Sequence, residues 1–297
     1  MNGSVTVIGG VNMDIGGSVA GELIMRDSNP GHVSIRPGGV GRNIAHNLRL
    51  LGLDVNLIAA LGGDLYGEAL LNSCRDLGIC MDMTLVLPQE RSSVYLYVTD
   101  GTGDMLLGLS DMDIVARLTP AYLAPLMQRI NRSAAVVLDA NLSEETILYL
   151  AEHCTAPMYA DPVSTAKAPK LKGALHKLRA IKPNALEAQT LTGESDPEKA
   201  AQALLKSGVK RVFISLGAEG LLAVEGDQSC RTGLTLHEYK AVNANGAGDA
   251  ATTALVWAGV CGLDLEASAR AAALAGAIVA ASPETNTPEL IRLLHEL

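Results

Sequence analysis

Short runs of aliphatic residues alternate with amphipathic stretches along most of the chain. Val5–Ile8 is an apolar run that ends in two glycines and predicts a buried strand. Apolar residues between Ile44 and Leu51 recur at the spacing of one helix face, which Gly52 closes. The same patterns predict strands at about 55–60, 134–138, 158–160 and 211–215, a hairpin-like run at 221–224, and helices at about 66–77, 119–130, 143–153, 184–191, 197–207, 247–261, 264–281 and 287–296. This alternation predicts an α/β fold, with a mostly parallel sheet and helices on both faces.

Two segments do not follow this alternation. The stretch from about 11 to 36 has only short β-like pieces and turn residues. Between about 83 and 109, aliphatic residues alternate with tyrosines from Val94 to Val98, and Asp100-Gly101-Thr102-Gly103 is typical of a hairpin turn. Strands without helices between them predict a small sheet that stands off the main domain. We therefore expect a single domain over residues 1–297, with lid segments at about 11–36 and 83–109.

The composition narrows the classes of function. Aromatic residues make up only 3% of the chain and the formal net charge is −9, with basic residues scattered along it. Neither feature suits a nucleic-acid partner or an anionic membrane surface. The longest apolar run, 271–281, is shorter than the roughly 20 residues that span a bilayer. Five cysteines without metal-ligand spacing, and an amino terminus without a basic leader, predict a cytoplasmic protein with reduced thiols.

The segment Asn243 to Ala250 holds the clearest candidate chemistry. Gly246 and Gly248 precede an amphipathic helix, so backbone N–H groups and the helix amino terminus can form an anion hole for a phosphoryl group. Asp249, in the first turn, can then accept the proton of an attacking hydroxyl. A helix cap explains the same aspartate equally well. The chain has neither a P-loop nor a GxGxxG after its first strand, which disfavours a dehydrogenase.

A second candidate is the segment Lys182-Pro183-Asn184-Ala185-Leu186-Glu187, which follows a short apolar strand. Asn184 and Glu187 are three residues apart and share one helix face. An amide and a carboxylate suit a hydrated Mg²⁺ that bridges nucleotide phosphates. The same spacing is that of an ordinary capping box, and taken alone it favours the cap.

Three further segments combine glycines with polar side chains. Asn12 and Asp14 follow the first strand, and Gly38, Gly39 and Asn43 stand at a predicted helix start. Amides and carboxylates beside glycine backbone match the donors and acceptors of sugar hydroxyls. The third segment, Ser215 to Gly220, has glycines that let a nucleotide lie close to the backbone. Turn and capping chemistry accounts for each segment equally well when it is taken alone.

Taken in this order, these segments resemble the PfkB-type carbohydrate kinases, the ribokinase-like family. The resemblance covers nearly the whole chain and rests on three stretches, Pro37 to Ala45, Lys182 to Glu187 and Gly246 to Ala250. It implies an ATP-dependent kinase with a ribokinase-like three-layer sandwich, a mostly parallel sheet and a small β-lid over the sugar. It also implies a homodimer formed through the lid. A sugar- or nucleoside-binding protein without turnover is the alternative from another class.

The resemblance also implies roles for individual residues. The base is Asp249, and the anion hole is Gly246, Ala247 and Gly248. The acceptor is bound by Asn12, Asp14, Gly38, Gly39 and Asn43. ATP is bound by Asn184, Glu187, Ser215, Gly217, Gly220 and Asn286, with Glu187 reaching Mg²⁺ through water. Some members bind K⁺ near this loop, but Asn243-Ala244-Asn245 replaces their usual acid and threonine, which argues against that site here.

Within the family, two stretches are most similar to bacterial members that phosphorylate pseudouridine. These are Asp27-Ser28-Asn29-Pro30-Gly31 and Asp100 to Met105, the latter followed by Ser110-Asp111-Met112. This similarity implies the 5′-hydroxyl of pseudouridine as the acceptor, and another sugar or nucleoside as the alternative. It concerns lid and loop segments, so it does not follow from the chemistry of the site.

Overall fold

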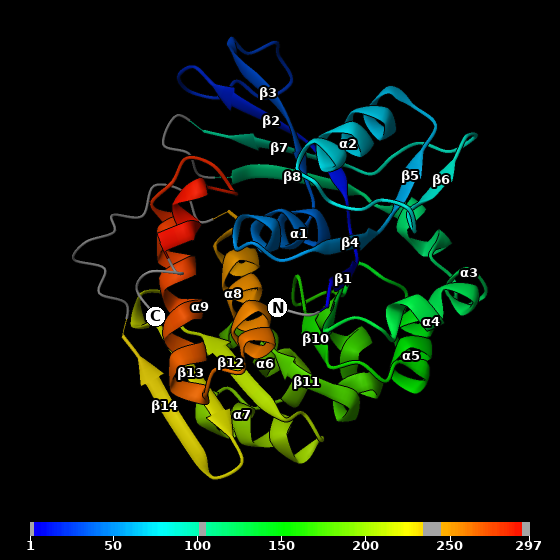
Figure 1. Cartoon of the computed structure of the whole chain (residues 1–297). Helices are drawn as coiled ribbons and strands as arrows, with labels where there is room; N and C mark the ends of the chain where they lie inside the picture. The colour runs from blue at the N-terminus through cyan, green and yellow to red at the C-terminus, as the bar shows by residue number, and fades with distance from the viewer. Residues whose placement is uncertain (1–2, 101–104, 234–244, 293–297) are drawn as a thin grey trace.

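A central eight-stranded sheet organises the molecule (Figure 1). The computed structural model describes residues 3–100, 105–233 and 245–292. The strands of the sheet are, in spatial order, β4 (Val55–Ile58), β1 (Val5–Ile8), β9 (Ala135–Asp139), β10 (Met158–Asp161), β11 (Leu178–Ile181), β12 (Arg211–Ser215), β13 (Leu221–Glu225) and β14 (Gln228–Thr232). All pairs from β4 to β12 are parallel, and β13 and β14 add an antiparallel edge.

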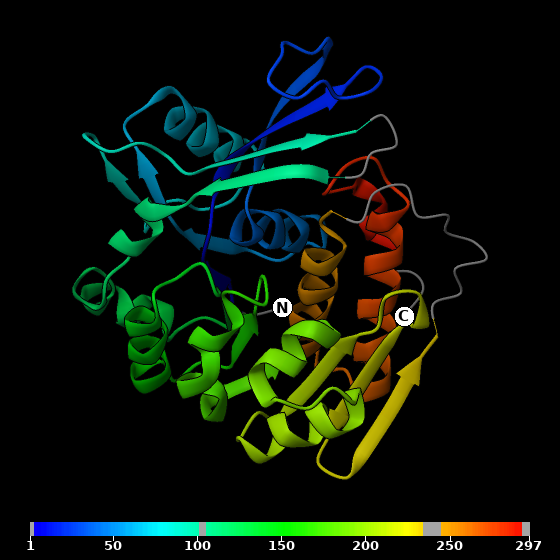
Figure 2. The same cartoon turned by 180° about the vertical axis from the view of Figure 1, so that it is seen from behind.

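Helices cover both faces of this sheet, as Figures 1 and 2 show. One face carries α1 (Val40–Leu50), α8 (Ala247–Cys261) and α9 (Leu265–Ala280), and the other carries α5 (Glu144–His153), α6 (Ala185–Thr192), α7 (Pro197–Lys206) and the 3₁₀ segment Ala168–Lys177. Successive strand residues alternate between the two cores, as strand geometry requires. Val137 belongs to one core, while Val136 and Leu138 belong to the other. The predicted three-layer α/β fold is confirmed.

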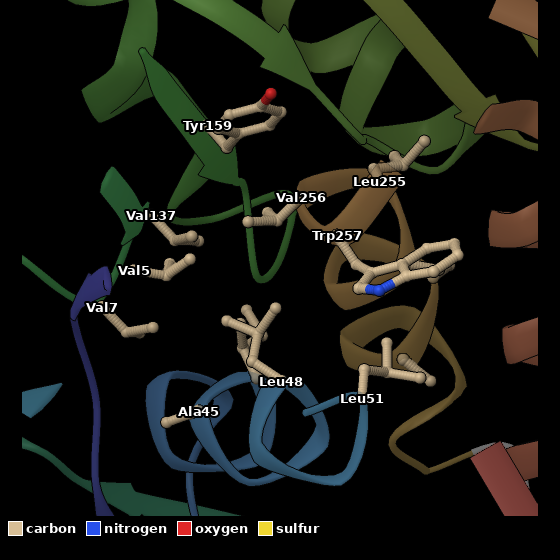
Figure 3. Packing of buried hydrophobic residues seen from close by; sticks show 14 of the residues in the cluster. Val5, Val7, Ala45, Leu48, Leu51, Val137, Tyr159, Leu255, Val256 and Trp257 are labelled. Carbon is tan, nitrogen blue, oxygen red and sulfur yellow. The ribbon is translucent and has the colours of Figure 1, made fainter. Parts of the chain in front are cut away.

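The central helix α8 is buried along most of its length. Residues 250–258 are all buried, and most of them are alanine, threonine or valine. In the core, Val256 and Trp257 of α8 lie close to Leu48 and Leu51 of α1, with Val5 of β1 beside them (Figure 3). Small side chains let α8 pack closely on its neighbours, and close packing fixes its position. The first turn of α8 is therefore held rigidly in place.

Four strands form a second, smaller sheet in the order β3-β2-β7-β8. They are β3 (Gly31–Gly38), β2 (Asn12–Val19), β7 (Val94–Thr99) and β8 (Met105–Asp111). Residues that pair across its strands form rows, and successive rows point to opposite faces of the sheet. Polar and aromatic residues share one row: Arg36, Asp14, Tyr95 and Ser110. The neighbouring row, on the opposite face, is apolar: Ile35, Ile15, Leu96 and Leu109.

The remaining elements lie outside these two sheets. They are β5 (Ala60–Gly62), α2 (Leu65–Asp76), β6 (Leu85–Leu87), the 3₁₀ turns Asp113–Arg117 and Gly217–Glu219, and the elements that replace the two helices discussed next. Within the described ranges, no helix is long and apolar enough to cross a bilayer.

Three predicted elements are wrong in detail. The segment 11–36 is not irregular but forms most of the eight-residue strands β2 and β3. The predicted helix 119–130 is divided into α3 (Pro120–Leu123), a 3₁₀ turn (Ala124–Leu126) and α4 (Met127–Ile130), because Pro125 has no N–H for a helical hydrogen bond. The predicted helix 287–296 is a 3₁₀ turn over Pro288–Arg292, and its last residues lie outside the described ones. The hairpin turn predicted at residues 100–103 also falls largely outside them.

Candidate active site

Charged side chains gather at the carboxyl ends of the parallel strands. Asp139 ends β9, Asp161 ends β10 in register with it, and Lys182 follows β11. In open α/β sheets, ligands bind at this edge. Two cavities lie there, of about 610 Å³ and about 630 Å³. We call them the acceptor cavity and the nucleotide cavity, after the ligands that the resemblance implies for the residues that line each of them.

The acceptor cavity lies between the small sheet and the end of the main sheet. The sequence-predicted residues Asn12, Asp14, Gly39, Asn43 and Gly246 line it. Asn12 and Asp14 belong to β2 of the small sheet, and the same sheet also contributes Ser34, Arg36, Tyr95, Tyr97 and Ser110. The rings of Tyr95 and Tyr97 are stacked with centroids 5.8 Å apart. The cavity therefore offers polar groups from the main domain and both polar and aromatic groups from the small sheet.

Asp14 is held at the base of β2. Its Oδ1 accepts a hydrogen bond from Asn12 Nδ2 at 2.5 Å. Burial raises the pKa of Asp14, and the hydrogen bond from Asn12 and the charge of Arg42 oppose that shift. Gly38 does not line the cavity, and a side chain there would collide with the Asp14 carboxylate. The predicted sugar contact at Gly38 is thus a packing position behind Asp14.

Gly39 sets the start of α1. Its φ of 101° lies in the region that favours glycine, and a Cβ there would stand 2.5 Å from the Gly10 carbonyl oxygen. This close approach brings the first turn of α1, with Asn43, against the carboxyl end of β1. The glycine therefore positions Asn43 for the cavity.

The nucleotide cavity brings together the second group of predicted residues. Asn184, Glu187, Ser215, Gly217, Gly220, Ala247 and Gly248 all line it, and its remaining walls are largely apolar. The glycines at both ends of the turn after β12 have positive φ, 61° at Gly217 and 91° at Gly220. A mostly apolar cleft with a few fixed polar groups is typical of a small-molecule site.

Asn184 and Glu187 form the capping box that their spacing also predicts. The Glu187 N–H donates to Asn184 Oδ1, and the Asn184 N–H donates to Glu187 Oε2, both at 2.8 Å. Burial raises the pKa of Glu187. The box engages one carboxylate oxygen of a side chain that lines the cavity, so the cap and a contact to a hydrated cation are compatible.

Asp249 lies between the two cavities. Three residues line both of them, Val40, Val163 and Asp249, and of these only Asp249 has a polar side chain. Its Oδ2 accepts a hydrogen bond from Asn43 Nδ2 at 2.8 Å. The capping position of α8 is Gly246, with φ of 81°, so Asp249 does not cap the helix.

The surroundings of Asp249 tune its protonation. Burial, with the nearby charge of Asp161, raises the pKa of Asp249 to about 7, although the hydrogen bond from Asn43 and the charge of Lys182 oppose the rise. A carboxylate with a pKa near neutrality is suited to accept a proton in catalysis.

Sequence reasoning missed Lys182 as a functional residue, although it lies within a segment that was singled out. Its Nζ is 4.0 Å from Asp161 Oδ2, both side chains are nearly buried, and both line the nucleotide cavity. Thr252 Oγ1 donates to the same Asp161 oxygen at 2.6 Å. A lysine at the carboxyl end of a predicted parallel strand was the available signal.

Asn286 is not brought to the nucleotide cavity. It is buried, and its Nδ2 donates to the Asn43 carbonyl at 3.1 Å and to Asn47 Oδ1 at 2.8 Å. The residue therefore supports α1 behind Asn43. Asn243 and Ala244, which bear on the K⁺ question, lie outside the described residues.

The fold is that of a carbohydrate kinase. The model of the pfkB family of carbohydrate kinases matches residues 2–292, and the chain belongs to this family. It is therefore a phosphotransferase that acts on a hydroxyl group of a small molecule.

Individual relatives are named for different acceptors. Pseudouridine kinase of Escherichia coli (strain K12) is 36% identical over 96% of this chain and 93% of its own length. Guanosine-inosine kinase of Exiguobacterium acetylicum is 25% identical over 98% of this chain and 99% of its own. Among solved structures, a carbohydrate kinase from Agrobacterium tumefaciens superposes with a TM-score of 0.86 at 29% identity, covering 98% of this chain and 96% of its own.

Proposed function

We propose that this protein transfers the γ-phosphoryl group of ATP to the 5′-hydroxyl of pseudouridine, giving pseudouridine 5′-phosphate and ADP. The observation that carries the proposal is the position of Asp249, the single polar residue among those that line both cavities. The 36% identical E. coli relative is named for this acceptor, which favours pseudouridine over other nucleosides.

On the acceptor side, Asp14 and Asn43 bind ribose hydroxyls, assisted by Asn12. Asp249 accepts the proton of the 5′-hydroxyl as its oxygen attacks phosphorus. Asn43 donates to Asp249 Oδ2, which leaves Oδ1 for that proton. Phosphoryl transfer needs mainly positioning and charge stabilisation. A fixed general base with a pKa near 7 is therefore sufficient to take up the hydroxyl proton.

On the nucleotide side, the N–H groups of the Gly246–Gly248 turn and the amino terminus of α8 face the transferring phosphoryl group. Lys182 adds a buried positive charge beside Gly248, where a Cβ would lie 3.6 Å from its Nζ. The turn from Ser215 to Gly220 receives the nucleoside of ATP.

We also propose a hydrated Mg²⁺ between Glu187 and the nucleotide phosphates. Glu187 and Asn184 fit this role, because a carboxylate and an amide oxygen donor face the nucleotide cavity together. When bound, the ion neutralises phosphate charge. Mg²⁺ in nucleotide sites usually keeps several waters, and we propose that Glu187 contacts it through one of them.

We propose that the small sheet is a lid that reads the nucleobase. Its row Arg36, Asp14, Tyr95 and Ser110 faces the acceptor cavity, and Tyr97 stacks on Tyr95. Stacked aromatic rings and hydrogen-bonding groups match a pyrimidine base. A free sugar would leave Tyr95, Tyr97 and Ser110 without a partner.

We further propose that the lid forms a homodimer. Its outer face is apolar, and Val33, Ile35, Leu107 and Leu109 on it are 75%, 56%, 51% and 58% exposed. Such a continuous apolar face on a sheet marks an association surface. A second copy of the same sheet is complementary to it in chemistry.

A panel of acceptors tests the function. Purified protein with MgATP is offered pseudouridine, uridine, guanosine, ribose and fructose 6-phosphate, and ADP and phosphorylated product are measured. We expect the highest kcat/KM with pseudouridine. Equal rates across the panel would refute this assignment but keep the kinase, whereas tight binding of an acceptor without phosphorylation would favour a non-catalytic binding protein.

A further inference from the structure

Few positive charges line the two cavities. Lys182 is the one in the nucleotide cavity, and Arg36 and Lys167 are those in the acceptor cavity, counted among the residues that the structure describes. Arg36 is exposed on β3 of the small sheet, whereas Lys167 is half-buried on the main domain. Lys167 has no role in the function proposed above, and sequence reasoning did not single it out.

The ammonium group of Lys167 is held in place by polar neighbours. Its Nζ donates to Asn141 Oδ1 at 2.6 Å. Asn141 in turn lies against Gly10, where a Cβ would stand 2.6 Å from Asn141 Nδ2. Burial lowers the pKa of Lys167, and the charge of Asp139 opposes that shift. One hydrogen bond to Asn141 leaves two of the three N–H donors of Lys167 available to a ligand.

Asp139 fixes the same corner from below. Its two carboxylate oxygens accept hydrogen bonds from the N–H groups of Gly10, at 2.8 Å, and Asn141, at 2.9 Å. The carboxyl ends of β1 and β9 are thus tied together under the cavity. Asn141, and through it Lys167, rests on a rigid base.

The turn that presents Lys167 is strained. Val163 has φ of 66°, a conformation that a β-branched residue rarely adopts. Its N–H donates to Asp161 Oδ1 at 2.8 Å, and the Ser164 N–H donates to the Pro162 carbonyl at 2.7 Å. The Lys167 N–H then closes the turn on the Ser164 carbonyl at 3.1 Å. Such strain persists where the surrounding structure holds it and clusters at functional sites.

The position of this turn matches the path of the phosphoryl group. Val163 lines both cavities together with Asp249, and Ser164 and Lys167 line only the acceptor cavity. Transfer moves a multiply charged group toward a cavity that holds the carboxylates of Asp14 and Asp249. A positive charge on the acceptor side offsets that repulsion, most of all as the group arrives.

We propose that Lys167 is a catalytic residue that binds the phosphoryl group from the acceptor side during transfer, and that Asn141 is the residue that positions it. The acceptor oxygen forms its bond to the γ-phosphorus while the bond to the oxygen of ADP breaks, and the hydroxyl proton goes to Asp249. Lys167 stays protonated throughout and donates hydrogen bonds to the transferred group. Lys182 performs the corresponding task on the nucleotide side. This inference rests on the proposed phosphoryl transfer.

Lys167→Met tests the inference against Lys172→Met, which removes an equal charge from an exposed position on the same segment. Steady-state kinetics are measured, together with the Kd of the unphosphorylated acceptor and of its phosphorylated product without ATP. We expect Lys167→Met to lower kcat by about 10²-fold, as the loss of one transition-state donor does. The Kd of the unphosphorylated acceptor should stay within about twofold, and that of the product should rise at least about tenfold, because only the product carries the group that Lys167 binds.

Three further variants complete the test. Lys167→Arg should restore part of kcat, and Asn141→Ala should lower kcat less than Lys167→Met while leaving the fold intact by thermal unfolding. Lys167→Gln replaces the Met variant if the latter does not fold. An unchanged kcat in Lys167→Met, or an effect confined to the KM of the acceptor, would overturn the inference. If the wild-type protein phosphorylates no acceptor, the proposed function fails instead, so the two failures are distinguishable.

Discussion

At the residue scale, the surroundings of Asp249 disfavour the ionised carboxylate, although a catalytic base needs that form. Its pKa of about 7 follows from burial and from the charge of Asp161, and Lys182 opposes the rise. A base must be ionised to accept a proton, so kcat/KM should rise with pH and level off above about 7. The dependence is measured between pH 5.5 and 9. A kcat/KM that stays flat down to pH 5.5 would contradict the role of Asp249.

The charge of Lys182 gives a sharper version of this test. Lys182 favours the ionised form of Asp249, so Lys182→Met should raise the pKa of Asp249 and move the rising limb of the kcat/KM profile to higher pH. Lys172→Met, at an exposed site, is the matched control and should leave the profile in place. If the rising limb of the kcat/KM profile keeps the wild-type position in both variants, Lys182 does not affect the pKa of Asp249.

The same pKa predicts a cost in stability. The ordinary pKa of an aspartate carboxyl is 3.8, and the pKa of Asp249 in the folded state is about 7. The folded state therefore binds this proton more tightly than the unfolded state. The stability from that proton is complete below about pH 4 and is lost as pH rises through about 7. Asp249→Asn keeps an oxygen that can accept from Asn43 and removes the ionisation. At pH 8 its free energy of unfolding should exceed that of the wild type by up to a few kcal/mol, at about 1.4 kcal/mol per pKa unit. It should therefore unfold at a higher temperature.

That difference should shrink as pH falls toward 5, which differential scanning calorimetry of both proteins checks. An Asp249→Asn protein that is less stable than the wild type at pH 8 would argue against a buried, unfavourable charge at this position.

Residue types and spacing predicted much of the site from the sequence. The residues around Asp14, Asn43, Glu187 and Asp249 do meet at one sheet edge. Asn286 does not, because its amide turns to α1. Lys167 lies in an irregular turn and owes its position to tertiary contacts, which no local pattern encodes.

At the element scale, the start of α8 carries the anion hole. Gly246 has φ of 81°, and a Cβ there would stand 2.7 Å from the Thr285 carbonyl oxygen. Gly262 ends the same helix with φ of 75° and nothing within 4 Å. Alanine at either position should cost about 1–2 kcal/mol of strain. Gly246→Ala should in addition lower kcat by about 10²-fold, because it displaces groups at the site of transfer.

Gly262→Ala, with similar strain and open space, should keep the wild-type kcat. Thermal unfolding and steady-state rates of the two variants separate stability from catalysis. Equal kcat values in both would mean that the geometry of the Gly246 turn does not contribute to transfer.

Elements with strong local patterns were predicted well, and those that depend on distant pairing were not. The helix α8 follows from its long apolar run, and the parallel strands of the main sheet follow from their short apolar runs. The polar edge strand β14 has no such run and was not predicted. The strands β2 and β3 contain glycines and polar residues, and they exist because β2 pairs with β7 across a long stretch of chain. The divided helix at Pro125 shows that a proline outweighs apolar periodicity.

At the scale of the whole molecule, the small sheet has one face for the substrate and one for a partner. If the apolar face joins two copies, Leu107→Asp with Leu109→Asp should yield monomers in analytical ultracentrifugation. Leu148→Asp, a 40% exposed position on α5, should leave the assembly unchanged. A wild-type protein that sediments as a monomer at micromolar concentration would contradict the proposed dimer.

The most direct test of the central claim compares phosphoryl transfer by the wild type and by Asp249→Asn. Both proteins receive MgATP and pseudouridine at pH 7.5, and labelled product and ATP affinity are measured. Losing the base should lower kcat by about 10²–10⁴-fold, while the Kd for ATP stays within a few-fold. An Asp249→Asn protein that forms pseudouridine 5′-phosphate at the wild-type rate would contradict the account.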